Sequence, residues 1–117
     1  MKFLKSEVDI ILPNYNSERY IKQTIESIKK QSFKNWKLII VDDASNLKTK
    51  KILSKLSNNK RIKVIWLPKN KGAGYCRNLA IKKSFSKYIA FIDSDDLWEK
   101  KKLELQIKFM KKNKCNF

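Results

Sequence analysis

Acidic residues gather directly after two apolar segments of this sequence. Asp42 and Asp43 follow the run 36–41, and the tetrad Asp93-Ser94-Asp95-Asp96 follows the run 88–92. Carboxylates crowded on one turn repel each other, and a hard cation such as Mn²⁺ or Mg²⁺ relieves this repulsion while phosphate oxygens and water fill its other positions. The tetrad therefore predicts a metal site for a phosphorylated ligand. The alternative is a helix N-terminus that Asp95 or Asp96 caps.

Three other polar segments could contact a nucleotide. Asp42 and Asp43 could accept hydrogen bonds from a base or a ribose, or they could provide a second metal ligand or a loop cap. Asn14-Tyr15-Asn16 could stack on a base and bond its edge, or could form an ordinary turn. The loop 70–78 contains both glycines of the chain and leads into a predicted helix, whose N-terminus favours phosphate. Within this loop, Arg77 could neutralise a diphosphate, brace the acids or form a structural ion pair.

Four short apolar runs must position these residues. The runs 8–12, 36–41, 62–67 and 88–92 are rich in β-branched residues and suit buried parallel strands. Helical patterns separate them, so the sequence predicts an α/β fold with a Rossmann-like open, mainly parallel sheet and flanking helices. Ligands of such sheets bind outside the carboxyl ends of the strands, where the polar segments fall.

Each predicted helix has an apolar face. Ser17 is expected to cap the first, and the third is expected to run from about Gly74 to about Phe85. The fourth is expected after Trp98. Their apolar residues are, in order, Ile21, Ile25 and Ile28; Ile52, Leu53 and Leu56; Leu79, Ala80 and Ile81; and Leu103, Ile107 and Met110.

Composition excludes several classes of protein. The chain has no histidine, which rules out a His general base, a Ser-His-Asp triad and a His-ligated zinc, and Cys76 and Cys115 are expected to be reduced thiols. The sequence contains no secretory signal and no apolar run of about 20 residues, so we expect a cytoplasmic protein. The net charge of +17 comes mainly from scattered lysines. We expect a solvated basic surface or peripheral contact with the inner face of the membrane, and no nucleic-acid partner.

The ordered motifs resemble the opening half of a family 2 glycosyltransferase with the GT-A fold. The resemblance extends from Val8 to about Met110, and its segments are 10–16, 27–32, 39–45, 70–72, 77–78 and 88–98. Asn14 stands where this family more often has Thr or Ser, Ala44 where it has Gly, and Cys76 where it has Ala.

The resemblance implies an inverting transfer from a nucleotide-diphosphate sugar, with UDP as the nucleotide, to a saccharide or lipid-linked acceptor. Mn²⁺ or Mg²⁺ would act as a Lewis acid on the leaving diphosphate. Tyr15 and Asp42 would flank the uracil with Asn14 beside them, Asp93 would lie near the ribose, and Asp95 would be the principal metal ligand. The predicted nucleotide-binding residues are Pro13, Asn14, Tyr15, Asn16, Glu18, Asp42, Lys71, Gly72, Arg77, Asn78, Asp93 and Ser94. The predicted metal ligands are Asp95 and Asp93.

A catalytic base is not assigned. In this family the base lies well beyond the metal motif, together with the acceptor-binding elements. After Asp96 only Glu99 and Glu104 carry carboxylates, and both are expected on the following helix, where neither is a plausible base. We therefore expect residues 1–117 to be a single donor-binding domain that stops before the acceptor-binding half. The alternative is a non-catalytic module that binds a nucleotide sugar or a partner protein.

Overall fold

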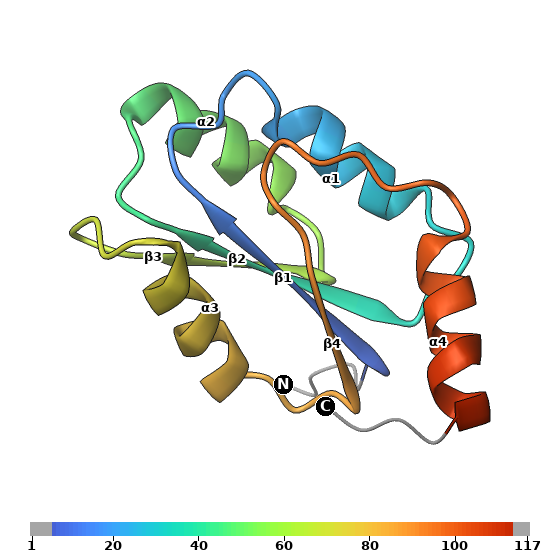
Figure 1. Ribbon diagram of the computed structural model, residues 1–117. Coiled ribbons are helices and arrows are strands. Elements are labelled where there is room, and N and C mark those ends of the chain that lie inside the picture. The colour runs from blue at the N-terminus through green and yellow to red at the C-terminus, as the bar shows by residue number, and fades with distance from the viewer. Residues whose placement is uncertain (1–5, 114–117) are drawn as a thin grey trace.

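The four apolar runs predicted from the sequence form one parallel sheet. The computed structural model describes residues 6–113, and its strands are β1 (Val8–Asn14), β2 (Trp36–Asp42), β3 (Ile62–Trp66) and β4 (Tyr88–Phe91). They pair in the order β3-β2-β1-β4, and every pairing is parallel (Figure 1). The predicted α/β fold with an open, parallel sheet is confirmed.

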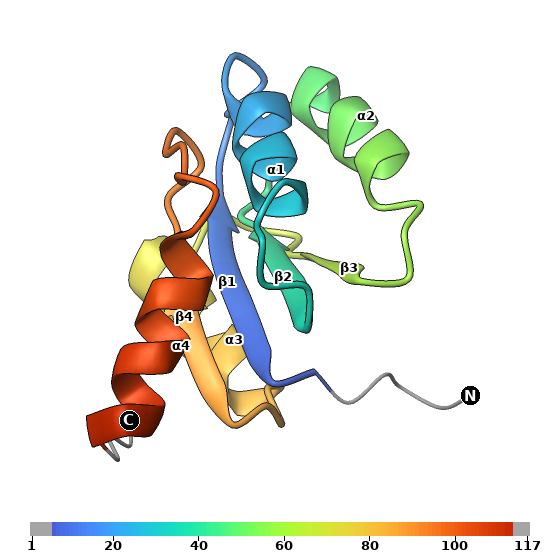
Figure 2. The same ribbon diagram turned by 90° about the vertical axis from the view of Figure 1, so that its right-hand side faces the viewer.

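Helices cover both faces of the sheet. α1 (Ile21–Lys29) and α2 (Leu47–Leu56) lie side by side on one face, and α3 (Ala73–Lys82) lies on the other (Figure 2). α4 (Lys102–Asn113) packs beside β4. Among the described residues, no helix is both long and apolar enough to cross a membrane.

Alternation along β1 divides the core into two layers. Ile10 and Leu12 are fully buried in the layer formed with α1 and α2, whereas Ile11 packs against Cys76 and Ala80 of α3. Strands of this kind are buried on both faces, which explains why their sequences are nearly continuous apolar runs and not alternating ones.

Three predicted details of the helices are wrong. Ser17 does not cap α1: the cap position is Tyr20, without a side-chain hydrogen bond, and the Ser17 hydroxyl donates to the Asn14 side chain. α3 ends at Lys82, before Phe85, and Ile81 is 40% exposed. Three consecutive residues cannot share one face of a helix with 3.6 residues per turn, so the buried face of α3 is formed by residues four apart.

The fourth predicted helix starts too far along the chain for Asp95 or Asp96 to cap it. Because α4 begins at Lys102, neither Asp95 nor Asp96 caps it, and Glu99 precedes the helix and does not lie on it. The acidic tetrad is therefore a separate turn. This finding removes the helix-capping alternative for Asp95 and Asp96.

The sheet opens between β1 and β4 at the carboxyl end of β1. The last paired residue of β1 on that side is Ile11, and its carbonyl accepts a hydrogen bond from Ile92 at 3.1 Å. Pro13, two residues further on, points its backbone nitrogen to the same side, where β4 has already ended. Its missing N–H therefore costs no ladder hydrogen bond. From β1 the chain continues to its neighbour β2 and then to β3, and it returns across the sheet through α3 to β4 on the other side of β1. The strand order therefore reverses between β1 and β4.

Candidate functional site

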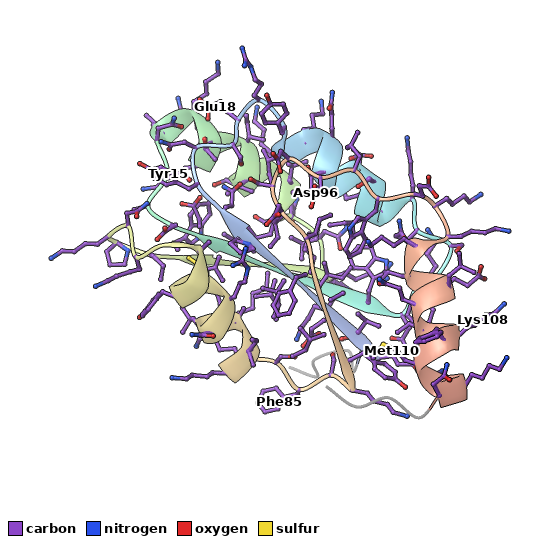
Figure 3. All side chains as sticks on the ribbon, viewed as in Figure 1. Tyr15, Glu18, Phe85, Asp96, Lys108 and Met110 are labelled. Atoms are coloured by element: carbon purple, nitrogen blue, oxygen red, sulfur yellow. The ribbon has the colours of Figure 1, made fainter. Side chains whose placement is uncertain are left out.

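A pocket of about 220 Å³ lies at this opening of the sheet. Pro13, Asn14 and Tyr15 from the end of β1 line it, and Asp93 and Ser94 line it from the segment after β4. Tyr15 is 53% exposed and offers its ring to solvent. In Figure 3, Tyr15 and Asp96 lie at the same edge of the sheet, whereas Phe85 and Met110 lie toward the opposite edge. The structure thus brings together five of the residues predicted to bind a nucleotide.

Three further residues line the same pocket: Asp43, Ala73 and Cys76. None of them was among the predicted binding residues. Asp43 stands next to the predicted Asp42, and the sequence alone offered no reason to choose between the two. Ala73 and Cys76 lie in the first turn of α3, directly before the predicted Arg77, and the predicted closeness of the loop 70–78 to a phosphate was the only signal that pointed to them.

Asp43 clamps the loop that leads into α3. Its two carboxylate oxygens accept hydrogen bonds from the backbone N–H groups of Lys71, at 2.6 Å, and Gly72, at 2.9 Å. Its backbone carbonyl accepts one from the Asn70 side chain at 3.3 Å. Gly72 has a φ of 91°, a conformation that suits glycine, and immediately precedes Ala73, the first residue of α3. The clamp therefore places the N-terminus of α3 at the pocket.

Asp42 is fully buried behind the pocket wall. Its carboxylate accepts hydrogen bonds from the Asn14 amide at 3.1 Å, and from the Ser45 N–H and hydroxyl at 3.1 and 2.6 Å. The Ser45 hydroxyl also accepts a bond from the Asn16 N–H at 2.9 Å. This network ties the ends of β1 and β2 together and fixes the orientation of Asn14.

Arg77 forms an ion pair with Asp93. The guanidinium lies 3.4 Å from the carboxylate, and the two side chains are 41% and 65% exposed. The sequence left three roles open for Arg77. The structure shows the ion pair, and because its partner is Asp93, this ion pair also braces the acidic turn. Because the pair is exposed, it contributes little to stability, so its main consequence is to orient Asp93.

The remaining predicted binding residues lie around the pocket and do not line it. Glu18 accepts hydrogen bonds from Thr49 at 2.8 Å and Asn46 at 3.3 Å, which attaches it to the start of α2. Lys71 and Asn78 are exposed, before and on α3 respectively. Asn16, with a φ of 47°, accepts a hydrogen bond from the Asn46 N–H. These residues could reach a ligand larger than the pocket itself.

The Cys76 thiol is an unreactive part of the pocket floor. Burial, followed by the negative charges of Asp43 and Asp42, raises its pKa to about 11. The thiolate is therefore scarce at neutral pH, and Cys76 acts as a small apolar residue. The Cys76 thiol is free, as predicted, and Cys115 lies outside the described residues.

The metal prediction depends on the acidic turn. Within residues 6–113, no group of three or more Asp, Glu, Cys or His side chains is placed to hold a metal ion. Asp93 and Asp95 are both exposed. Two oxygen-bearing side chains fit Mn²⁺ or Mg²⁺ bound together with a ligand, because such ions take one or two carboxylates and complete their coordination with phosphate oxygens and water.

An open parallel sheet with a pocket at the reversal of strand order defines an α/β nucleotide-binding fold of the GT-A type. The chain belongs to glycosyl transferase family 2, which matches residues 9–117. This result confirms the resemblance inferred from the motifs.

Two curated relatives are similar over nearly the whole chain. TuaG of Bacillus subtilis, named for teichuronic acid biosynthesis, is 43% identical over 97% of this chain and 45% of its own length. WfgD of Escherichia coli, a UDP-Glc:alpha-D-GlcNAc-diphosphoundecaprenol beta-1,3-glucosyltransferase, is 43% identical over 94% of this chain and 43% of its own length. The chain thus spans less than half the length of these relatives.

Solved structures show the same architecture. S. aureus TarS (residues 1–349), in complex with UDP-GlcNAc, matches with a TM-score of 0.84 at 35% identity, over 91% of this chain and 31% of that one. The mannosyltransferase PcManGT from Pyrobaculum calidifontis, in complex with GDP-Man and Mn²⁺, matches with a TM-score of 0.82 at 20% identity, over 91% of this chain and 32% of that one. At this lower identity, the likeness concerns the fold alone.

Proposed function

We propose that this chain binds a UDP-sugar and is the donor-binding part of a glycosyltransferase. The observation that carries the proposal is the pocket at the strand-order reversal, which joins Tyr15 at the end of β1 to Asp93 and Ser94 after β4. Uridine is the favoured nucleoside because WfgD is named for UDP-Glc, and TarS was solved with UDP and with UDP-GlcNAc.

The base would lie against the end of β1. Tyr15 is half exposed at the pocket and presents an aromatic face for stacking. Asn14 and Asp42, hydrogen-bonded to each other, supply the polar wall behind it. We propose that the ring N–H and carbonyl groups of uracil meet this wall. The family resemblance has Asp42 flank the uracil. In this arrangement Asp42 would act on the base largely by orienting Asn14, to which it is hydrogen-bonded.

The diphosphate would lie between the acidic turn and the start of α3. Asp95 and Asp93 would hold Mn²⁺ or Mg²⁺ together with the phosphate oxygens. When bound, such a cation acts as a Lewis acid and stabilises the charge on the leaving diphosphate. The N-terminus of α3, placed by Asp43, directs backbone N–H groups toward negative charge, and Lys71 lies beside it.

The acceptor would be a saccharide or a lipid-linked saccharide, glycosylated with inversion. WfgD is named for an acceptor linked to diphosphoundecaprenol. For an acceptor of this kind, we place the protein at the inner face of the membrane, where its charge of +17 favours anionic lipid.

A second candidate function is nucleotide-sugar binding without turnover. The observation that favours it is the position of the two carboxylates after Asp96. Glu99 precedes α4, Glu104 lies within α4, and neither lines the pocket. Transfer catalysed by the chain alone would rule out this candidate, whereas binding without transfer would agree with it and with a donor-binding part that needs further protein.

Thermal unfolding with UDP, GDP and dTDP, each with and without Mn²⁺, tests the binding proposal. A ligand at about 100 times its dissociation constant adds about 2.7 kcal/mol, which raises the melting temperature by roughly 10 °C for a domain of this size. We expect this shift with UDP and Mn²⁺ and its loss in Asp95→Ala.

The matched control is Glu26→Ala, which removes one carboxylate from the exposed surface of α1, where it pairs with Lys29 at 3.7 Å. This variant should keep the UDP-dependent shift. A cooperatively folded wild-type chain that shows no shift with any nucleotide would overturn the proposed function. An equal shift in Asp95→Ala would overturn the metal assignment while leaving nucleotide binding in place.

A further inference from the structure

Polar side chains of α1, and of Gln31 just after its end, hold the segment that connects β4 to α4. The Thr24 hydroxyl donates to the Ser94 carbonyl at 2.8 Å, and the Ser27 hydroxyl accepts a hydrogen bond from the Trp98 N–H at 3.2 Å. Further along, the Gln31 amide donates to the Glu99 carbonyl at 2.7 Å.

Two of these three side chains are completely buried. Thr24 lies on α1 and Gln31 lies two residues after its end, and neither has any exposed surface. A buried polar side chain is costly unless it is hydrogen-bonded. Here the partners are backbone carbonyl groups of a segment about 70 residues away, so α1 and the residue Gln31 after it fix the course of this segment.

The acidic tetrad is a four-residue turn whose ends bond each other. The Asp96 N–H donates to the Asp93 carbonyl at 3.0 Å, and the Asp93 N–H donates to the Asp96 carboxylate at 3.2 Å. Ser94 and Asp95 are the central residues. The proposed metal ligands therefore lie on either side of one residue, and their relative orientation depends on the central Ser94–Asp95 peptide.

The central peptide of such a turn has two common orientations. They differ by a flip that separates type I from type II turns, and the type II form requires positive φ at the third residue. Among the described non-glycine residues, positive φ occurs only at Asn16 and Ala44, so Asp95 is not in the type II form. The Ser94 carbonyl, which the flip would turn away, is the atom that Thr24 holds.

We propose that Thr24 is a positioning residue for the cation, and this inference rests on the proposed function. Its hydroxyl keeps the Ser94–Asp95 peptide in the orientation that presents Asp93 and Asp95 to one ion. Ser27 and Gln31 bond the segment further along, at Trp98 and Glu99, so Thr24 alone of the three bonds the turn itself.

The test uses Thr24→Val, which removes the hydroxyl and keeps the shape of the side chain. The matched control is Ser86→Ala. It removes one partly buried hydroxyl that donates to Asp9 at 2.6 Å, at the amino end of the sheet. Thr24→Ser retains a hydroxyl and serves as the rescue variant. The readouts are the dissociation constant of Mn²⁺ in the presence of UDP, the dissociation constant of UDP without metal, and the melting temperature of each variant.

We expect Thr24→Val to weaken Mn²⁺ binding about tenfold, the lower end of the loss for outer-shell partners of metal ligands. Its metal-free UDP affinity should stay within about twofold of wild type, since one hydrogen bond is worth little when it does not touch the ligand. Thr24→Ser should restore Mn²⁺ binding, and Ser86→Ala should leave it unchanged.

Unaltered Mn²⁺ binding in Thr24→Val would overturn the inference, and so would an equal loss in Ser86→Ala. If the wild-type chain binds no UDP with Mn²⁺, the proposed function fails separately. In that case, amide hydrogen exchange across residues 93–99 of the unliganded chain decides the inference. Faster exchange in Thr24→Val than in Ser86→Ala supports the anchoring of the turn, whereas equal exchange overturns it.

Discussion

Replacing Asp43 by Asn should loosen the loop before α3 and destabilise the chain. The carboxylate accepts two backbone hydrogen bonds, at 2.6 and 2.9 Å, and the residue is only 4% exposed. An Asn side chain has one oxygen, so its amide group must face either the Lys71 or the Gly72 N–H, and two donors would meet. The side chain keeps its size, which limits the change to charge and hydrogen bonding.

The expected cost follows from these two bonds. A hydrogen bond to a charged group contributes about 1.5–3 kcal/mol, and an unpaired buried N–H costs about 1–3 kcal/mol. The relief of repulsion with the adjacent Asp42 offsets part of this loss. We expect Asp43→Asn to lower the free energy of unfolding by about 2–4 kcal/mol, which moves the urea midpoint down by roughly 1–2 M at a typical slope.

The same variant should change the Cys76 thiol. After burial, the charge of Asp43 is the largest cause of the raised Cys76 pKa of about 11. Removing that charge should lower the pKa, so alkylation of the thiol should start at lower pH. The measurement uses a Cys115→Ala background in which Cys76 alone reacts.

Asp93→Asn is the control for stability, because its ion pair with Arg77 is exposed and such pairs contribute about 0–1 kcal/mol. If Asp43→Asn costs no more than Asp93→Asn, the clamp does not hold the loop. An alkylation profile that matches the parent's would show that the Asp43 charge does not act on the thiol.

Two further substitutions test the backbone and the buried charge. Ala44 has a φ of 61°, which costs an L-residue about 1–2 kcal/mol, so Ala44→Gly should stabilise by about 0.5–1 kcal/mol after the entropy of the unfolded glycine is subtracted. Chemical denaturation checks this, and Ala80→Gly within α3 should instead destabilise. Burial raises the pKa of Asp9, but hydrogen bonds from Ser84, Ser86 and Ser6, with the charge of Lys37, outweigh it and lower the pKa overall. The stability that Asp9 contributes is therefore present above the unfolded pKa of about 3.9 and is lost as the pH falls through the lower folded pKa. Asp9→Asn should consequently flatten the decline of the urea midpoint below about pH 4. An unchanged decline would contradict this expectation.

The sequence by itself determined the class of fold and the edge of the sheet that carries the site. Runs such as 36–41 are apolar on both faces, which only a strand covered by helices on both sides satisfies, and helical patterns separate them. Because parallel strands end at the same edge, the polar residues after each run had to gather there. The ordered motifs added the family, which the match to residues 9–117 confirms.

Local pattern was weaker at the ends of the elements. Ser17 has the residue type of a helix cap, yet its hydroxyl bonds Asn14, because the turn at 17–20 delays α1 until Ile21. The acids at Asp95 and Asp96 likewise suit a cap, but the helix that follows starts at Lys102. In both cases, a residue of a type common at helix caps takes part in a different local structure.

Only the tertiary structure decided which residues meet. Asp42 and Asp43 are adjacent in sequence, but one is buried against Asn14 and Ser45 and the other clamps the loop at Lys71 and Gly72. Thr24 finds its partner 70 residues away, at Ser94. Such contacts depend on the strand order β3-β2-β1-β4, which places β4 beside β1, and no local pattern contains that order. The pairing of β4 with β1 stops at Ile11, before Pro13. The pocket exists for the same reason: β1 and β4 separate at their carboxyl ends, beyond the last paired residues Ile11 and Phe91.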